Sequence, residues 1–435
     1  MTTTEPQTPA NERFGGLFAD WAGARPGGAV AVVRAGELVY RAAFGMADVA
    51  TLAPFRPDHR FPIASVTKHM TVFCLLLLER EGLVSLDDRV ADKFPGLLNV
   101  DAPITVRHLA ANTSGLRDYI TLATYAGGRL ITDLRSPTIE RLIRGQTSLN
   151  FAPGAEYSYS NSNFVVLSWI IARLTGRTFA EAMRERLFAP LGMDDTAVIV
   201  RSTDVPGNAV TGYAGVHARF APWHWDMDLA GEGGVWSTLD DLIRWERNLS
   251  RPVAGSAEIV RRMGAVQPLN DGNPSEYALG LRRGLVCGHP WEGHSGGWEG
   301  YRSFHLRLPQ QDVGIIVIAN HTAEIGTAAV EVAQACLPPP SPPERLAGVY
   351  VCAELETAIT VTVVEGQLHL AVESPVGRQT GLQLCRRSDA TFYLSRAAQQ
   401  RWDLEFDTTV SFEAGGAALV LTSEPARGVR FLRRR

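Results

Sequence analysis

A single proline-rich segment constrains the fold of this 435-residue chain more than any other feature. It reads Leu337-Pro-Pro-Pro-Ser-Pro-Pro-Glu344. Proline has no backbone N–H and a fixed φ, so this run can continue neither a helix nor a central strand and acts as a semi-rigid spacer. We therefore expect a linker at residues 338–344 between two separately folded parts, residues 25–337 and 345–435. Residues 1–24 are expected to form a flexible or helical lead-in.

The part after the linker has the alternating pattern of antiparallel strands. Ile359–Val364 and Gln367–Val372 flank a Glu365-Gly366 turn, which predicts a hairpin. Trp402–Asp407 places its apolar side chains on one face, and Gly415-Gly416 supplies another turn. This part is therefore expected to be an all-β module, a small barrel.

The larger part mixes helices with strands. Residues 65–81 predict a helix that is apolar on nearly every face from Met70 to Leu78, as a helix buried in the core would be. The other expected elements are strands at 29–33, 38–40, 303–308 and 313–320, and helices at 138–144, 168–186, 240–248 (capped by Thr238 or Asp240) and 322–335. The pattern predicts an α+β domain.

Composition excludes several classes of function. A net charge of −4 argues against binding to nucleic acid or to an anionic membrane surface. The longest apolar run, Val72–Leu78, is too short to span a bilayer, and the polar start has no apolar signal region. The five cysteines are odd in number and lack metal-ligand spacing, so we expect reduced thiols and a cytoplasmic location. Neither a metal nor a cofactor is expected.

Only two of the 42 basic residues are lysine, and one of them lies in Ser65-Val66-Thr67-Lys68. Arginine stays charged at any working pH, whereas a buried lysine can release its proton. In Ser-x-x-Lys, the serine attacks and the lysine one helical turn later accepts its proton. Composition bias and an N-capping serine are the alternative explanation. Lys93, in Asp92-Lys93-Phe94-Pro95, is expected to be a solvated surface residue.

Two further motifs add to this pattern. Tyr159-Ser160-Asn161 lies in a polar loop before an apolar segment, where a tyrosine could carry protons and an asparagine could orient the lysine. His294-Ser295-Gly296-Gly297 precedes a strand, and its glycines would let a backbone N–H approach a reacting carbonyl. Taken singly, each motif could instead be a helix cap or a glycine turn.

Together these motifs resemble those of the penicillin-recognising serine hydrolases, which include serine β-lactamases and D,D-peptidases. The resemblance covers residues 25–335 and extends to Asn112–Tyr119, Leu187–Met193 and Gly231–Thr238. It implies a β-lactamase/transpeptidase-like fold: an antiparallel sheet flanked by helices, with a helical subdomain. It also implies roles for five side chains: Ser65 as nucleophile, Lys68 as general base, Tyr159 as proton carrier, Asn161 as orienting group and His294 as positioning group for Tyr159 or the substrate. The backbone N–H groups of Ser65 and Gly297 would form the oxyanion hole.

The third motif indicates a branch of this family. No Lys-Thr-Gly occurs, so the lysine that often binds a substrate carboxylate is missing and a permanent cation is not expected there. The His-x-Gly motif is similar to the third motif of D-stereospecific aminopeptidases and D-amino-acid amidases. This resemblance implies that the chain hydrolyses D-aminoacyl amide bonds through an acyl-enzyme. A carboxylesterase, a weak β-lactamase and a catalytically silent sensor are the alternatives.

The substrate site is less constrained by the sequence. We expect Gly296, Trp225, Asp226 and Glu232 to bind the substrate, with Asp228 and Glu299 as other possible receivers of its amine. The expected partner is a small molecule or short peptide, and a homodimer is left open.

Overall fold

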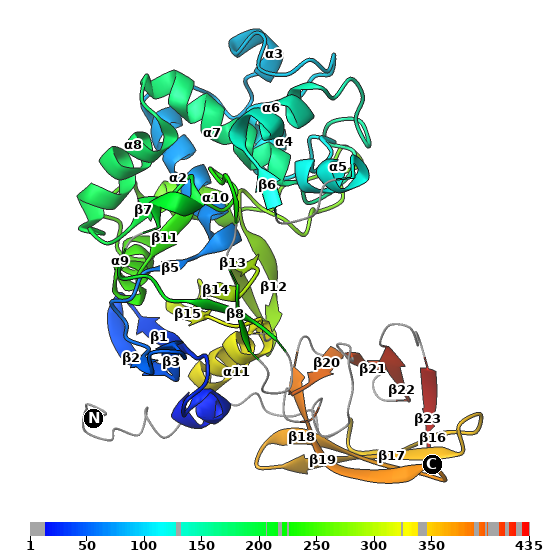
Figure 1. Ribbon diagram of the computed structural model, residues 1–435. Coiled ribbons are helices and arrows are strands. Elements are labelled where there is room, and N and C mark those ends of the chain that lie inside the picture. The colour runs from blue at the N-terminus through cyan, green and yellow to red at the C-terminus, as the bar shows by residue number, and fades with distance from the viewer. Residues whose placement is uncertain are drawn as a thin grey trace. The chain divides into compact units, whose positions relative to one another are not determined.

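The computed structural model describes residues 14–127, 132–205, 207–215, 220–223, 226–322, 325–337, 346–386, 391–395, 398, 409–413, 417–422 and 429–434. Its contacts divide the chain into two units (Figure 1). The first contains Met1–Arg283 and Glu292–Gly326, and the second contains Gly284–Trp291 and Thr327–Arg435. The expected linker, residues 338–344, lies outside the described residues, so its place in the chain stays a prediction.

An antiparallel sheet forms the centre of the first unit. Among the described residues its strand order is β12-β13-β14-β15-β1-β2. The bounds are β12 Arg282–Val286, β13 His289–Trp298, β14 Tyr301–Leu308, β15 Val313–Ala319, β1 Gly28–Arg34 and β2 Glu37–Phe44. Strand β1 pairs with β15 from Gly28↔Ala319 to Arg34↔Val313, so segments nearly 300 residues apart in sequence are neighbours. The four strands predicted in this region are therefore present.

Helices surround this sheet and form a separate helical region (Figure 1). Helix α2 is buried along most of its length, from Thr67 to Leu78, as the apolar run predicted. The helices and short turns of this unit are η1 Gly16–Trp21, η2 Ala64–Val66, α2 Thr67–Arg80, α3 Val90–Lys93, α4 Val106–Ala110, α5 Tyr119–Tyr125, α6 Ser136–Arg144, α7 Asn161–Thr175, α8 Phe179–Met183, η3 Arg184–Phe188, η4 Ala189–Leu191, η5 Ser202–Asp204, α9 Leu239–Ser250 and α10 Ala257–Gly264. Helix α11, Gly326–Cys336, belongs almost wholly to the second unit.

Two predicted helices have the wrong bounds. The segment 168–186 is not one helix, because Gly176 adopts a left-handed conformation (φ 64°) and ends α7. Helix α7 also begins earlier, at Asn161, and α8 starts afresh behind a Thr178–Glu181 capping box. Helix α11 begins at Gly326 rather than at residue 322.

Short strands complete the first unit: β3 Met46–Asp48, β4 Ala53–Pro54, β5 Phe61–Pro62, β6 Thr132–Leu134, β7 Ala197–Val198, β8 Gly212–Ala214, β9 Ala221–Trp223, β10 Asp226–Met227 and β11 Val235–Ser237. Strand β11 lies between β5 and β7, and β5 leads directly into Ser65. The position of β11 therefore fixes the approach to the predicted nucleophile.

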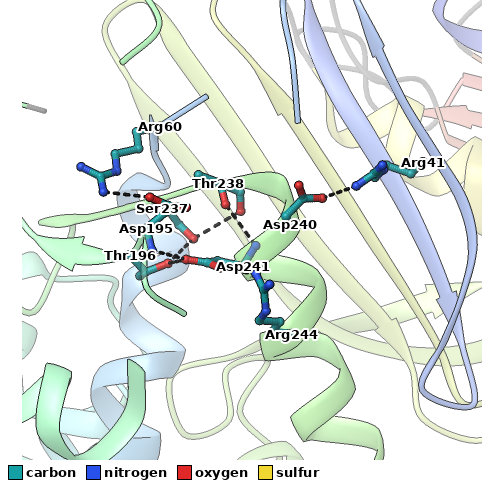
Figure 2. Close-up of polar contacts among 9 residues, drawn as sticks. All are labelled: Arg41, Arg60, Asp195, Thr196, Ser237, Thr238, Asp240, Asp241 and Arg244. Atoms are coloured by element: carbon teal, nitrogen blue, oxygen red, sulfur yellow. Dashed lines mark hydrogen bonds and ion pairs between the residues drawn. The ribbon is translucent and has the colours of Figure 1, made fainter. Parts of the chain in front are cut away.

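A polar cluster anchors β11 to the start of α9 (Figure 2). The buried Asp241 carboxylate accepts hydrogen bonds from the Asp195 backbone N–H (2.9 Å) and the Thr196 hydroxyl (2.8 Å). Thr196 also shares a 2.8 Å hydrogen bond with Ser237, the last residue of β11. Thr238 caps α9 by accepting from the Asp241 N–H, which confirms one of the two predicted caps.

The second unit contains a closed barrel of eight antiparallel strands within the described residues. Its strands are β16 Gly348–Cys352, β17 Thr357–Val364, β18 Gln367–Ser374, β19 Gly377–Arg386, β20 Thr391–Leu394, β21 Thr409–Glu413, β22 Ala418–Thr422 and β23 Val429–Arg433. Pairing of β16 with β23 closes the barrel, and residues such as Ile359, Leu370 and Leu382 fill its interior. The predicted fold class is confirmed, including the β17–β18 hairpin. The predicted strand at 402–407 and the Gly415-Gly416 turn lie outside the described residues.

Candidate active site

Ser65 lies in the middle of the short turn η2, where the chain passes from β5 into α2. The Ile63 N–H donates to the Val235 carbonyl (3.0 Å), which fixes the approach from β5. Ala64, directly before Ser65, has a left-handed φ of 46°. Non-glycine residues held in this region cost about 1–3 kcal/mol and concentrate at functional sites. The backbone is therefore strained at the residue that presents the serine.

Lys68 lies one helical turn after Ser65 and has no solvent exposure. Its Nζ is 2.9 Å from Ser65 Oγ, 2.8 Å from Asn161 Oδ1 and 2.7 Å from the Glu232 carbonyl oxygen. The amide and carbonyl oxygens can only accept hydrogen bonds. A neutral amine has two N–H groups for these acceptors and one lone pair, which then points toward the Ser65 hydroxyl. The geometry thus suits Lys68 as a proton acceptor.

Burial also favours the neutral amine. Desolvation lowers the pKa of Lys68, the Glu232 and Asp118 carboxylates oppose this shift, and the Arg282 guanidinium adds a smaller lowering, so that the pKa is about 7. A substantial fraction of Lys68 is therefore uncharged near neutral pH.

Tyr159 approaches the serine from the loop before α7. Its hydroxyl donates to Ser65 Oγ at 2.9 Å, and its ring centroid is 4.9 Å from Lys68 Nζ. Burial raises the pKa of Tyr159, so the phenol keeps its proton. Asn161 is the first residue of α7, and its N–H donates to Asp118 Oδ2 at 2.6 Å. The structure thus brings the first two predicted motifs together at Ser65.

His294 does not hydrogen-bond to Tyr159. Its Nε2 lies 2.9 Å from the buried Tyr277 hydroxyl, and its Nδ1 lies 2.6 Å from the Ser295 carbonyl oxygen. A carbonyl only accepts, so Nδ1 carries the ring proton and Nε2 accepts from Tyr277. Burial and the nearby Lys68 hold the pKa of His294 well below its usual value. His294 is therefore a neutral, fully bonded residue of β13.

The two glycines of the third motif differ in their surroundings. A Cβ at Gly296 would collide with Ser303 Oγ and the Ile63 carbonyl oxygen, so only glycine lets β13 approach the segment before Ser65. A Cβ at Gly297 would meet nothing closer than Arg302, at 3.8 Å. Both glycines line a cavity of about 470 Å³.

The predicted substrate-binding residues are only partly described. Glu232 is buried, and its carboxylate accepts from the Tyr119 hydroxyl (2.9 Å) and the Ala230 N–H (3.1 Å). It is therefore engaged inside the protein, while its backbone carbonyl bonds to Lys68. Asp226 belongs to β10, but its side chain and all of Trp225 lie outside the described residues. Asp228 is buried and accepts from the Ser136 N–H and hydroxyl.

A permanent cation that the sequence did not indicate lies beside Tyr159. The Arg282 guanidinium carbon is 5.3 Å from the Tyr159 ring centroid. Arg282 begins β12, so it reaches the site from a neighbouring strand rather than from the His-x-Gly motif. Its sequence neighbourhood contains no signal that would have indicated this position.

Tyr277, Tyr119 and Asp118 also belong to the site and were not predicted as site residues. The segment Asn112–Tyr119 contains two of them and was noted only for its resemblance. Tyr277 stacks on Tyr157 at a centroid distance of 5.6 Å and contacts Tyr159 edge-on at 6.2 Å. Its contribution depends on tertiary contacts that the sequence does not reveal.

No cluster of three or more histidine, cysteine, aspartate or glutamate side chains suited to a metal occurs in the described parts of the chain. No helix among those parts is long and apolar enough to cross a membrane.

Known proteins resemble this chain in sequence over about three quarters of its length. D-aminopeptidase from Gluconobacter oxydans (strain 621H) is 34% identical over 347 residues, which are 78% of this chain and 65% of that protein. D-aminopeptidase from Brucella canis (strain ATCC 23365 / NCTC 10854 / RM-666) is 35% identical over 327 residues, or 74% of this chain and 61% of that protein. The chain thus spans less than two thirds of these relatives' length.

Solved structures share the fold. The octameric penicillin-binding protein homologue from Pyrococcus abyssi has a TM-score of 0.65 at 19% identity, covering 98% of this chain and 100% of that one. D-amino acid amidase from Ochrobactrum anthropi SV3, complexed with D-phenylalanine, has a TM-score of 0.63 at 24% identity, covering 76% and 99%. The model of the Beta-lactamase family matches residues 13–335. The resemblance predicted from the three motifs is thereby confirmed, and this chain belongs to the Beta-lactamase family.

Proposed function

We propose that this chain is a serine hydrolase that cleaves amide bonds of D-aminoacyl peptides or amides through an acyl-enzyme at Ser65. The observation that carries the proposal is that Ser65 Oγ lies 2.9 Å from both Lys68 Nζ and the Tyr159 hydroxyl. A serine needs an adjacent base to attack a carbonyl, and its leaving group needs a proton. One buried amine and one buried phenol are placed for these two tasks.

In the proposed acylation, neutral Lys68 accepts the Ser65 proton as Oγ attacks the substrate carbonyl. The lowered pKa of Lys68 and the raised pKa of Tyr159 favour lysine over tyrosine as the base in the free enzyme. Tyr159 then passes its proton to the leaving amine and regains one from the lysine ammonium. In deacylation, a water molecule replaces the leaving group and the same transfers run in reverse.

The backbone N–H groups of Ser65 and Gly297 are proposed to bind the carbonyl oxygen as it becomes negative. One such donor is typically worth about 10²–10³ in rate. His294 is uncharged and fully bonded, so we assign it a positioning role in β13.

The D-aminoacyl preference is supported by the D-aminopeptidases, which share 34–35% identity with this chain over their matched regions. A second candidate is weak β-lactamase or carboxylesterase activity. Arg282 favours the β-lactamase alternative, because a permanent cation beside Tyr159 suits substrates that carry a carboxylate.

One preparation can test these proposals. Wild-type protein and Ser65→Ala are compared on D- and L-aminoacyl p-nitroanilides, p-nitrophenyl esters and nitrocefin. We expect Ser65-dependent turnover with preference for D-aminoacyl anilides. Turnover of esters or nitrocefin alone would support the second candidate, and equal turnover by Ser65→Ala would refute the nucleophile. A silent sensor would show no acylation burst with an activated ester.

We also propose a cytoplasmic location, supported by the free thiols of Cys74, Cys352 and Cys385. A homodimer stays a prediction that light scattering coupled to size-exclusion chromatography can test.

A further inference from the structure

The cavity at β13 holds a carboxylate that the proposed chemistry does not use. Its lining consists of Ile120, Ser295, Gly296, Gly297, Trp298, Glu299, Arg302, Ser303, Phe304 and Ile325. Gly297 is the proposed oxyanion donor, so this cavity adjoins the position of the reacting carbonyl. Glu299 lies two residues further on, in the turn between β13 and β14.

We propose that Glu299 binds the α-ammonium group of the substrate's aminoacyl unit, while the apolar part of the cavity receives its side chain. This inference rests on the proposed function and specifies its substrate: an N-terminal residue with a free amine and an apolar side chain.

Glu299 is available for such a role. It is half-buried, and within the described parts of the chain its carboxylate accepts no hydrogen bond and makes no ion pair. A partly desolvated carboxylate of this kind favours an ammonium partner, since charge-assisted hydrogen bonds are stronger than neutral ones. The substrate ammonium would donate a hydrogen bond to a carboxylate oxygen of Glu299, and no covalent bond would change.

Other carboxylates near the site are already engaged. Asp118 accepts from three backbone N–H groups, those of Ile120, Thr121 and Asn161. Glu232 is buried against Tyr119. Glu276 is exposed and lies near Tyr157, whose pKa is raised mainly by burial and to a lesser extent by the Glu276 carboxylate. It is not part of the cavity lining, so Glu299 is the carboxylate best placed beside Gly297.

The Glu299 side chain is close enough to Gly297 to contact the α-ammonium group of a bound substrate. Two peptide units join Gly297 to Glu299, so their Cα atoms can be at most about 7 Å apart. In an aminoacyl group, the α-nitrogen is two bonds from the carbonyl carbon. A carbonyl oxygen bonded to the Gly297 N–H therefore leaves the α-ammonium within reach of the Glu299 side chain.

Arg302 and Glu299 line the cavity with opposite charges. Its Nη1 donates to the carbonyls of Trp298 (2.7 Å) and Tyr301 (2.8 Å), which holds the guanidinium against the hairpin beside Gly297. The cation favours negative charge on the carbonyl oxygen, while Glu299 provides the opposite charge further along the turn. Ile120, Trp298, Phe304 and Ile325 supply the apolar surface.

Binding to catalytically silenced protein tests this inference independently of turnover. The Ser65→Ala variant is titrated by calorimetry with D-phenylalaninamide and with 3-phenylpropionamide, which differ only in the amine. We expect at least tenfold tighter binding of the amine-bearing ligand, and loss of this difference in Ser65→Ala/Glu299→Gln. Equal binding of both ligands, or an unchanged difference in the double variant, would overturn the proposal.

Kinetics provide a second readout on the active enzyme. Glu299→Gln should lower kcat/KM at least tenfold for D-phenylalanyl p-nitroanilide and less than threefold for the p-nitrophenyl ester of 3-phenylpropionate. An equal loss on both substrates would mean that Glu299 acts on chemistry or folding and would overturn the assignment.

The control variants are Glu258→Gln, on the exposed face of α10, and Glu276→Gln. Neither variant should change the ratio of the two kcat/KM values. A tenfold change of this ratio in Glu276→Gln, with no change in Glu299→Gln, would show that Glu276 binds the amine and would overturn the assignment of Glu299. Absence of any Ser65-dependent turnover would refute the proposed function, whereas the calorimetric difference would still decide the amine site.

Discussion

Replacing Lys68 by arginine separates charge from basicity in this site. Both side chains are cations in water, but a guanidinium has only donors and no lone pair for the Ser65 proton. Lys68 has a pKa lowered to about 7, so about 90% of it is neutral at pH 8. Arginine has a pKa above about 12, which leaves less than about one molecule in 10⁴ neutral at that pH.

The expected loss follows from these fractions. General base catalysis contributes about 10²–10⁴ to a rate, and the fraction of neutral base falls by about 10⁴, the upper end of that range. We therefore expect kcat/KM of Lys68→Arg to fall by about 10³ or more. The assay is hydrolysis of an activated D-aminoacyl p-nitrophenyl ester at pH 8, with burst amplitude reporting acylation.

The chain offers a matched control for this substitution. Lys93, the other lysine, is 42% exposed and lies 3.4 Å from Asp88. Lys93→Arg should retain full activity. Because a guanidinium is bulkier than the amine that fills this fully buried position, Lys68→Ala is tested in parallel for rescue by added primary alkylamines. Retention of more than about a tenth of wild-type activity in Lys68→Arg, at an unchanged melting temperature, would refute the assignment of Lys68 as base.

Three further predictions concern the electrostatics and packing of the site. Protonation of Lys68 removes its lone pair, so kcat/KM should fall as the pH drops through about 7. Glu232→Gln removes a negative charge that raises the pKa of Lys68, so this fall in kcat/KM should occur at lower pH. Arg282→Gln removes a positive charge that lowers the pKa of Lys68, so the fall should occur at higher pH. Shifts of the same sign in both variants, measured from pH–rate profiles, would contradict this electrostatic account. Gly296→Ala should destabilise the protein by about 1–3 kcal/mol, because its Cβ collides with Ser303 and Ile63, while Gly297→Ala should keep the wild-type melting temperature. Equal melting temperatures of the two variants would show that β13 can move away. Tyr277→Phe leaves the buried Nε2 of His294 without its donor, and at a cost of about 1–3 kcal/mol it should lower kcat more than it changes KM. A wild-type kcat in Tyr277→Phe would mean that the hydrogen bond between Tyr277 and His294 does not position β13.

The sequence was sufficient for the fold class and for the residues that touch Ser65. Apolar periodicity predicted the buried α2, and the motifs Ser65-x-x-Lys68 and Tyr159-x-Asn161 are brought together because each begins or precedes a helix that packs in the core. Patterns of this kind can be predicted from sequence because they depend on residues that are close together in the chain.

What the sequence missed depends on contacts between distant segments. Arg282 reaches Tyr159 from β12, and Tyr277 bonds to His294 across 17 positions of the chain. The helix end at Gly176 was missed because an isolated glycine inside an apolar stretch is also tolerated within helices. The local sequence does not indicate that Glu232 is buried against Tyr119, so it predicts Glu232 as a substrate-binding residue.

The proposed mechanism requires that Lys68 loses its proton near neutral pH, and because the chain has only two lysines, this titration can be measured directly. Protein labelled with ¹³C at lysine Cε should give two signals, which Lys68→Arg and Lys93→Arg assign. We predict that the Lys68 signal titrates with a pKa of about 7. A Lys68 signal that keeps the chemical shift of a protonated amine up to pH 9 would contradict the mechanism.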